Sequence, residues 1–277
     1  TGPSVILATA LAALVARCNA LSSAQLAAAH PVSGGAYEYG YRLLTPSLGF
    51  TAGWMFLCAK TASAATAALG FSGYLLHLAD VDGTTARIAL AVCCVAVLTA
   101  LTAGGIKRSN TANTLIVSLT IGSLLIFIVG VAPAGIRGAG DHLSPFFAGE
   151  DLGGSAGANF LQATALMFVA FTGYGRIATL GEEVHEPRRT IPKAIVTTLA
   201  ASALLYIFLA LAAVSAAGTA ALSAAVDEAA APMEIVAAAY AFPGAALIVS
   251  FGAVTAMLGV LLNLILGLSR VLLAMAR

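Results

Sequence analysis

Residues 171 to 192 read FTGYGRIATLGEEVHEPRRTIP and place groups that can bind a ligand inside an apolar region. Apolar residues precede this stretch from Ala158 to Ala170 and follow it from Ala194. Gly173 and Gly175 allow backbone angles that interrupt a helix, and an interruption frees carbonyl and amide groups. Freed carbonyls bind cations such as an ammonium group, whereas the amino-terminal ends of half-helices attract carboxylates. The stretch therefore predicts a broken helix that binds a charged small molecule.

Arg176 strengthens this interpretation. Glycines by themselves also serve close packing between helices, so Gly173 and Gly175 leave packing as an equal alternative. A charged side chain inside a membrane is expensive and usually functional. We expect Arg176 to meet a ligand carboxylate or to pair with an acidic group at an inner gate.

The composition indicates which class of protein contains this stretch. Of the 277 residues, 60% are hydrophobic and only 9% are charged, and the mean hydropathy is +0.97. Soluble domains carry about 25% charged residues, so the chain is predicted to be an integral membrane protein in contact with the lipid bilayer. The net charge of +1 argues against a nucleic-acid partner.

Neither a cofactor, a metal nor an enzyme site is predicted. The segment EEVHE holds a single histidine and lacks the helical HExxH pair of zinc sites. The segments GYGRIATLG and GGSAG are not followed by GK[ST], as a phosphate-binding loop requires. The four cysteines lie in apolar runs and are interpreted as small core residues; they are Cys18, Cys58, Cys93 and Cys94.

The elements that position the stretch are expected to be membrane-spanning helices. A hydrocarbon core of about 30 Å needs about 20 apolar residues in a helix, and long runs without alternation of period two exclude strands. The fold class is therefore all-α, a multi-span helical bundle that forms a single transmembrane domain over residues 1–277. Seven runs qualify: 4–29, 46–76, 86–104, 112–132, 158–181, 194–217 and 243–268. Residues 134–157 are expected to form a long outer loop, and 233–242 a short outer helix.

Lysine and arginine give the expected orientation, because cytoplasmic loops are enriched in both. Two of these residues, Arg87 and Arg137, belong to one set of alternate loops. Eight belong to the other set, which is predicted to be cytoplasmic: Arg42, Lys107, Arg108, Arg188, Arg189, Lys193, Arg270 and Arg277. We expect the chain in the plasma or inner membrane of the cell. Three charged residues, Arg17, Lys60 and Arg176, fall inside spans.

Several segments, in order, resemble the amino acid–polyamine–organocation (APC) superfamily of permeases. FVAFTGYGRIATLGEEVHEPRRTIPKAI resembles the sixth helix and its following loop. The run from GPSVILATALAAL to PVSGGAYEYGYRLL resembles the second helix and its PxSGGxY turn. GFTAGWMFLCAK resembles the start of the third helix, GGIKRSNTANTLI the link from fourth to fifth, and GLSRVLLAMAR the end of the eighth. The resemblance implies a partial inverted-repeat fold with helices two to eight of about twelve. We expect a fragment that lacks helix one and helices nine onward.

The resemblance also implies a binding site. It places the backbone of five residues at the unwound centre of helix six, as ligands of a substrate's α-ammonium: Val169, Ala170, Phe171, Thr172 and Gly173. Tyr174 and Gly175 belong to the same segment. Phe171 or Tyr174 is a candidate aromatic gate, and packing inside the bundle is an equal alternative for each.

Lys60 and Thr120 are the candidate coupling residues. Matched to the family, Lys60 falls where the third helix lines the central cavity. Some proton-coupled relatives carry a lysine in the fifth helix, and VSLTIGSLL puts Thr120 at that place. We hypothesise that Lys60 takes over the role of proton carrier or counter-ion and contributes to substrate binding. The alternative is a lysine that snorkels or bonds to carbonyls.

The remaining polar residues have weaker interpretations. Glu182 and Glu183 are expected to form a cytoplasmic ion-pair network with Arg188 and Arg189 that steadies the inner gate, with a solvated loop as an equal alternative. Arg17 is interpreted as a structural partner of a carbonyl or carboxylate. Asn263 is expected to pack, with a hydrogen bond between helices as the alternative.

The expected function is secondary transport of amino acids by alternating access, coupled to protons or working by exchange. Arg176 stands where many relatives carry an acidic residue, which disfavours a strongly cationic substrate. The alternative is a non-transporting sensor or assembly subunit derived from a permease. A channel is less expected, because no pore loop or charged ring is repeated in the sequence.

Overall fold

The computed structural model describes residues 2–30, 32, 34–79, 81, 83–104, 106–147, 155–180, 184–227 and 232–276. Within these ranges the chain forms helices joined by turns, and no strand occurs. The helical fold class is therefore confirmed. The chain divides into two compact units, one made of residues 1–35 and 127–246 and the other of 36–126 and 247–277. A single transmembrane domain over residues 1–277 stays a prediction.

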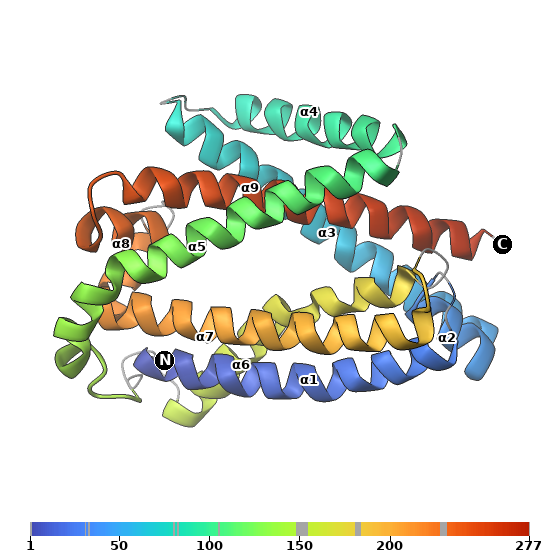
Figure 1. Cartoon of the computed structure of the whole chain (residues 1–277), viewed down its shortest axis with the longest axis horizontal. Helices are drawn as coiled ribbons and strands as arrows, with labels where there is room; N and C mark the ends of the chain where they lie inside the picture. The colour runs from blue at the N-terminus through green and yellow to red at the C-terminus, as the bar shows by residue number, and fades with distance from the viewer. Residues whose placement is uncertain are drawn as a thin grey trace. The chain divides into compact units, whose positions relative to one another are not determined.

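Unit 1 is built around α1 (Val5–Ala29), which packs against both α6 (Ala156–Phe171) and α7 (Pro187–Asp227) (Figure 1). A short 3-10 turn, η1 (Gly2–Ser4), precedes α1, and a 3-10 helix, η3 (Thr172–Leu180), follows α6. Alanine recurs every third or fourth residue on the buried side of α1, so the backbones of its neighbours approach closely. These alanines are Ala8, Ala12, Ala16, Ala20, Ala24 and Ala27.

A kink in α7 is held by the end of α5. Gly218 has φ +74 and ψ 165, which is outside the helical region. The His142 ring packs against Gly218, and His142 Nδ1 lies 2.9 Å from the carbonyl oxygen of Ser215. Helix α8 (Pro232–Tyr240) follows α7 and confirms the predicted short helix at 233–242.

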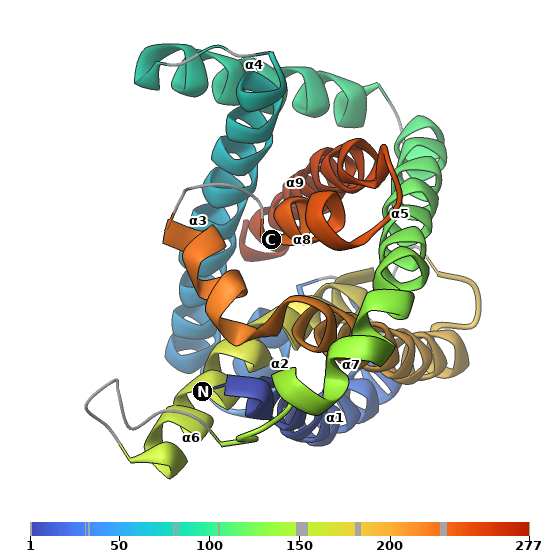
Figure 2. The same cartoon turned by 90° about the vertical axis from the view of Figure 1, so that its left-hand side faces the viewer.

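Unit 2 contains α2 (Ala36–Leu43), α3 (Pro46–Leu78), α4 (Thr84–Ala103), most of α9 (Ala245–Met275) and the first part of α5 (Ile106–His142). Figure 2 shows α3 and α4 joined as a pair, and α4 packs on α3. Their core with α9 consists of Ala68, Ala91, Cys94, Leu98, Leu261 and Leu262.

Helix α2 was not predicted from the sequence. Its Glu38 and Arg42 form an ion pair one turn apart, which is a local signal for a helix. Gly40 lies against Gly49, where an added Cβ would stand 2.9 Å from the Gly49 Cα, so α2 folds closely onto α3. Tyr39 of α2 is buried, and this burial raises the pKa of Tyr39 to about 12.

Six of the seven predicted spans are confirmed as helices long and apolar enough to cross a membrane, judged on the described residues. They cover Gly2–Ala29, Thr84–Ala103, Thr111–His142, Ala156–Ile177, Pro187–Ala224 and Ala245–Met275. The seventh run, 46–76, forms the continuous helix α3. Helix α3 is not among the six candidate spans, and Lys60 and several serine and threonine residues interrupt its apolar run.

The predicted outer loop at 134–157 was wrong in its first part. Helix α5 continues through Pro133 to His142. Proline has no backbone N–H, so the carbonyl of Val129, four residues earlier, loses its usual helical donor. Arg137 Nε donates a hydrogen bond to the Pro133 carbonyl at 3.0 Å. A proline inside a long apolar helix is tolerated when the freed groups find other partners.

Candidate functional site

The candidate site is the point where α6 changes into η3. Helix α6 begins at Ser155, whose side chain accepts a hydrogen bond from the Ala158 amide at 3.2 Å. The α-helix remains regular through Phe171. At Thr172 the backbone amide donates to the Val169 carbonyl, three residues back, and Thr172 Oγ1 donates to the same carbonyl at 2.8 Å. A 3-10 helix then runs for nine residues, Thr172–Leu180, and its part up to Ile177 lies inside a candidate span.

The change of helix type begins later than expected. Val169, Ala170 and Phe171 were expected at the unwound centre, but all three are α-helical. The Val169 carbonyl already accepts two hydrogen bonds from Thr172, so it is not a free ligand group. Of the five predicted backbone ligands, Thr172 and Gly173 lie in η3, and their role in binding stays a prediction.

Gly173 and Gly175 do not have the backbone angles that were expected of them. Neither has a positive φ, and a Cβ added at either would meet nothing within 4 Å. Neither close packing nor a left-handed backbone therefore requires glycine here. Glycine instead weakens the α-helix by about 1 kcal/mol per residue relative to alanine, which favours the change to the more tightly wound 3-10 form.

Phe171 and Tyr174 attach the site to neighbouring helices. Phe171 is 3% exposed, and its ring centroid lies 5.3 Å from that of Tyr206 on α7. Tyr174 is buried and forms a side-chain hydrogen bond with Asn19 on α1. Tyr206 and Asn19 were missed by the sequence analysis, because no local pattern identifies the partners of an aromatic side chain. The contacts favour the packing interpretation of both aromatic residues over a gate.

The predicted inner-gate network is described only in part. Arg176 is half-buried on η3. Glu182 and Glu183 lie outside the described residues. Arg189 is exposed in the first turn of α7, and its amide donates to the Glu186 carbonyl at 3.0 Å. The ion pairs of this network stay a prediction.

Lys60 and Thr120 belong to unit 2, whereas the α6–η3 junction belongs to unit 1. Lys60 is half-buried, and its Nζ lies 5.8 Å from the centroid of the Phe56 ring one turn earlier, which is within the range of a cation–π contact. Thr120 Oγ1 donates to the Ile116 carbonyl at 2.9 Å and lies 3.2 Å from Thr255 Oγ1 on α9.

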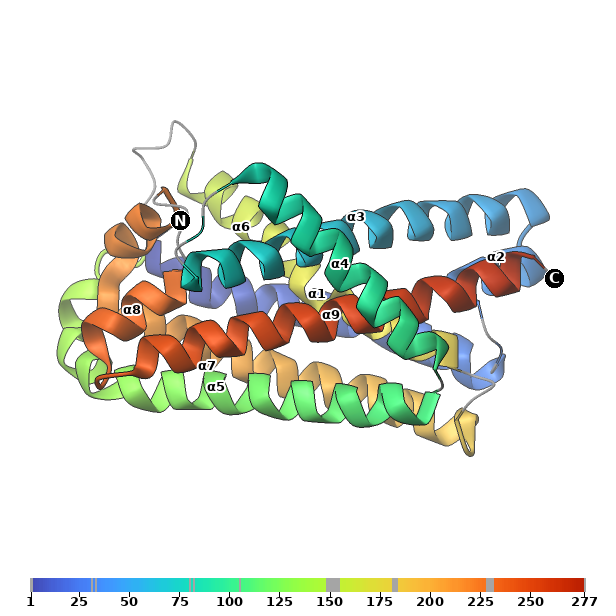
Figure 3. The same cartoon turned by 90° about the horizontal axis from the view of Figure 1, so that it is seen from above.

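Thr120 is one member of a polar seam between α5 and α9, which lie alongside each other in Figure 3. Asn263 Nδ2 donates to Asn113 Oδ1 at 2.6 Å, so Asn263 joins two helices. Gly252 faces Ser123 further along. Small and polar residues are typical of helix interfaces in membranes. Thr120 is therefore placed in the packing of unit 2.

Unit 1 also contains an apolar cavity of about 370 Å³. Ala170 and Tyr206 are among the residues that line it, together with residues of α1, α7 and α8. Among the described residues, no three His, Cys, Asp or Glu side chains form a cluster that could hold a metal ion.

The comparison with known proteins decides the family. The family model described as amino acid permease matches residues 1–277. The chain belongs to the amino acid permease family. This membership agrees with the resemblance to the APC superfamily and with the apolar helices, so the chain is an integral membrane protein.

The relatives of this chain described below are named transporters or permeases. The chain is 41% identical over 277 residues to an uncharacterized transporter of Mycobacterium tuberculosis. The alignment covers 100% of this chain and 59% of that transporter. It is 30% identical over 297 residues to the branched-chain amino acid permease of Bacillus subtilis, covering 100% of this chain and 60% of the permease. A methylthioribose transporter of Bacillus subtilis is 29% identical over 222 residues, covering 74% and 46%. The chain thus spans about three fifths of the length of the mycobacterial transporter and of the branched-chain amino acid permease.

Proposed function

We propose that this chain forms part of a secondary active transporter that moves amino acids across the cell membrane by alternating access. The observation that carries the proposal is the change from α-helix to 3-10 helix at Thr172 inside a membrane-spanning segment. Irregular backbone at membrane depth occurs where it is buried in protein or lines a wet cavity, and transporters use such segments as binding sites.

The proposed substrate is an amino acid with an uncharged side chain. The backbone of Thr172, Gly173 and Gly175 supplies carbonyl groups for its α-ammonium. No carboxylate occurs between residues 156 and 181 to attract a cationic side chain, and Arg176 repels one. The name of the branched-chain amino acid permease agrees with this choice.

The division into two compact units supports alternating access. Unit 1 contains the α6–η3 junction, and unit 2 contains Lys60. In the proposed mechanism each unit keeps its internal packing while the arrangement of the two changes, as in other transporters with inverted repeats. Lys60 carries the coupling proton if the transporter is a symporter; exchange is the other mode of driving uptake.

Uptake by the purified chain in proteoliposomes tests the proposal. We expect saturable uptake of radiolabelled leucine that excess unlabelled valine suppresses and excess lysine does not. Protein-free liposomes are the control. Leucine binding without uptake would contradict transport by this chain and support a sensor or assembly subunit. Flux that does not saturate would indicate a channel, and stronger suppression by lysine would contradict the proposed substrate class.

A further inference from the structure

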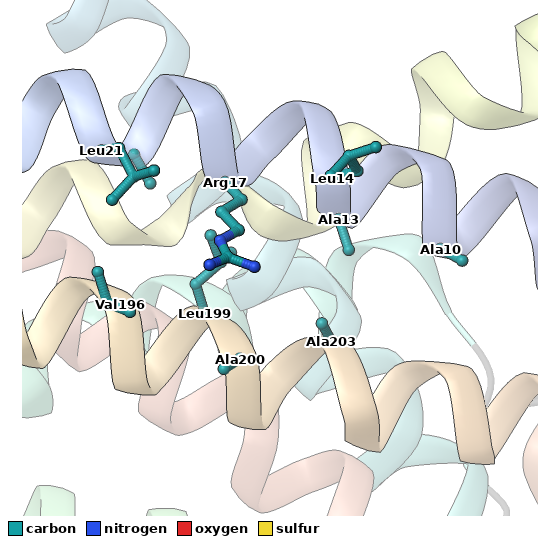
Figure 4. A pocket seen from close by; sticks show the side chains of 10 residues that line it. Ala10, Ala13, Leu14, Arg17, Leu21, Val196, Leu199, Ala200 and Ala203 are labelled. Carbon is teal, nitrogen blue, oxygen red and sulfur yellow. The ribbon is translucent and has the colours of Figure 1, made fainter.

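A groove in unit 1 contains an arginine at the middle of a membrane-spanning helix. It lies between α1 and α7, has a volume of about 310 Å³ and includes Arg17 among its lining residues. Figure 4 shows the Arg17 side chain directed from α1 towards α7, beside Leu199. The other lining side chains are apolar, and five of them are small: Ala10, Ala13, Ala20, Ala200 and Ala203.

Arg17 lacks the partner that its position requires. It is exposed, and among the described residues it has no hydrogen-bond or ion-pair partner. Helix α1 runs from Val5 to Ala29, so Arg17 lies about 18 Å from either end at 1.5 Å per residue. Even its long stem cannot carry the guanidinium group from this depth to the surface of a hydrocarbon core about 30 Å thick. An unpaired charge at this depth is unfavourable.

We propose that this groove is the docking surface of a further membrane-spanning helix that carries a carboxylate at mid-depth. Guanidinium groups prefer carboxylates, which they bind through two parallel hydrogen bonds. The alanines on both sides allow a helix to approach closely. The groove extends from Ala10 to Leu21 on α1, which is about three helical turns and fits a helix lying along it.

Other occupants fit less well. A lipid phosphate stays at the membrane surface, far from Arg17. A second copy of this chain offers no carboxylate at mid-depth, because its acidic residues all lie at or beyond the ends of the predicted spans. The acidic helix therefore comes from outside these 277 residues.

Energy transfer between the labelled chain and a labelled probe peptide in phosphatidylcholine vesicles tests the proposal. The probe is a leucine–alanine helix of spanning length with one central glutamate, and its matched control carries glutamine instead. We expect the glutamate peptide to bind wild type about tenfold more tightly, which corresponds to about 1.4 kcal/mol. Arg17→Gln should remove this preference and Arg17→Lys should keep part of it.

Two further variants separate docking from general effects. Val15 lies at the same depth and does not line the groove, so Val15→Gln should keep the preference. Ala200→Phe fills the groove and should weaken binding of both peptides. Equal binding of the two peptides to wild type, or a preference that survives Arg17→Gln, would overturn the proposal. Loss of the preference when phosphatidylglycerol is added would assign Arg17 to an anionic lipid and would also overturn it.

Discussion

At the scale of single residues, the packing of unit 2 depends on pairs of residues that meet between α5 and α9. Gly252 on α9 faces Ser123 on α5, and a Cβ added to Gly252 would stand 1.8 Å from Ser123 Oγ and 2.4 Å from Ser123 Cβ. Nearby, Asn113 and Asn263 share a hydrogen bond across the same two helices. Each pair determines how closely α5 and α9 approach.

Gly252→Ala is expected to destabilise the protein, because the added methyl group overlaps Ser123 and forces the helices apart. Overpacking of this kind typically costs about 1–3 kcal/mol. The midpoint of thermal unfolding in detergent measures the effect. Gly122→Ala is the matched control, since a Cβ there meets nothing within 4 Å. Ser123→Gly in the Gly252→Ala background should restore the midpoint; unchanged midpoints in all variants would contradict the described seam.

Lys60→Ala is expected to abolish proton-dependent uptake and to weaken substrate binding, because Lys60 is proposed both to carry the proton and to contribute to the site. A loss of at least about tenfold in uptake rate corresponds to about 1.4 kcal/mol. Uptake with and without a proton gradient, together with equilibrium binding, gives the two readouts. Phe56→Leu removes the ring beside the ammonium and should keep most of the uptake. Full gradient-dependent uptake by Lys60→Ala would exclude the coupling role.

At the scale of helices, two interruptions distinguish unit 1 from a bundle of regular helices. One is the change from α6 to η3 at Thr172, and the other is the kink of α7 at Gly218. The first is tied to α7 by Phe171 and to α1 by Tyr174. The second is packed against His142 at the end of α5. Both interruptions are therefore held by contacts between helices.

Replacing both Gly173 and Gly175 by alanine is expected to weaken substrate binding without loss of stability. Alanine favours the α-helix by about 1 kcal/mol at each position, so α6 should extend into η3 and change the direction of the carbonyls proposed as ligands. Equilibrium binding of leucine and the thermal midpoint are measured together. Gly157→Ala, also without neighbours within 4 Å, is the control. Unchanged affinity in the double variant would exclude η3 as the binding segment.

Gly218→Ala is expected to lower stability by about 1–2 kcal/mol, because the residue has φ +74 and an L-side chain is strained there. The added Cβ would also stand 3.2 Å from the His142 ring. Chemical or thermal unfolding in detergent is the measurement. Gly140→Ala on α5 is the control, because a Cβ there meets nothing within 4 Å. This variant should unfold at nearly the same midpoint as wild type. Equal stability of Gly218→Ala and Gly140→Ala would contradict the positive φ described for Gly218.

At the scale of the whole molecule, the charge distribution along the chain predicts how it crosses the membrane. Eight lysine and arginine residues belong to one set of alternate loops, and that set should face the cytoplasm. The α7 start belongs to this set, whereas the end of α5 belongs to the other.

Single cysteines in a background without the four native cysteines test this orientation. Asp141 and Arg188 are both exposed. Asp141→Cys should react with a membrane-impermeant maleimide in intact cells, and Arg188→Cys should react only after permeabilisation. The labelled fraction measured on gels checks both. Reaction of Arg188→Cys in intact cells would reverse the predicted orientation.

The amino-acid sequence by itself determined the helical class, the positions of the long helices and the membership of a permease family. These follow from local properties, because an apolar run long enough to cross lipid has to satisfy its backbone groups within one helix. The stretch at Thr172 was also recognised as an interruption, from Gly173, Gly175 and Arg176. The exact residue where the interruption begins was missed. It is set by the hydrogen bond from the Thr172 amide to the Val169 carbonyl, which only the folded chain shows.

The tertiary structure alone decided which residues from distant parts of the chain meet. Tyr206 beside Phe171, Asn19 beside Tyr174 and Thr255 beside Thr120 are separated by many residues in sequence. No periodicity encodes such pairs, because helix packing depends on the shapes of two surfaces at once. The same reason explains Arg17: the sequence shows a charge inside a span, and only the packing of α1 on α7 shows that it lies in a groove.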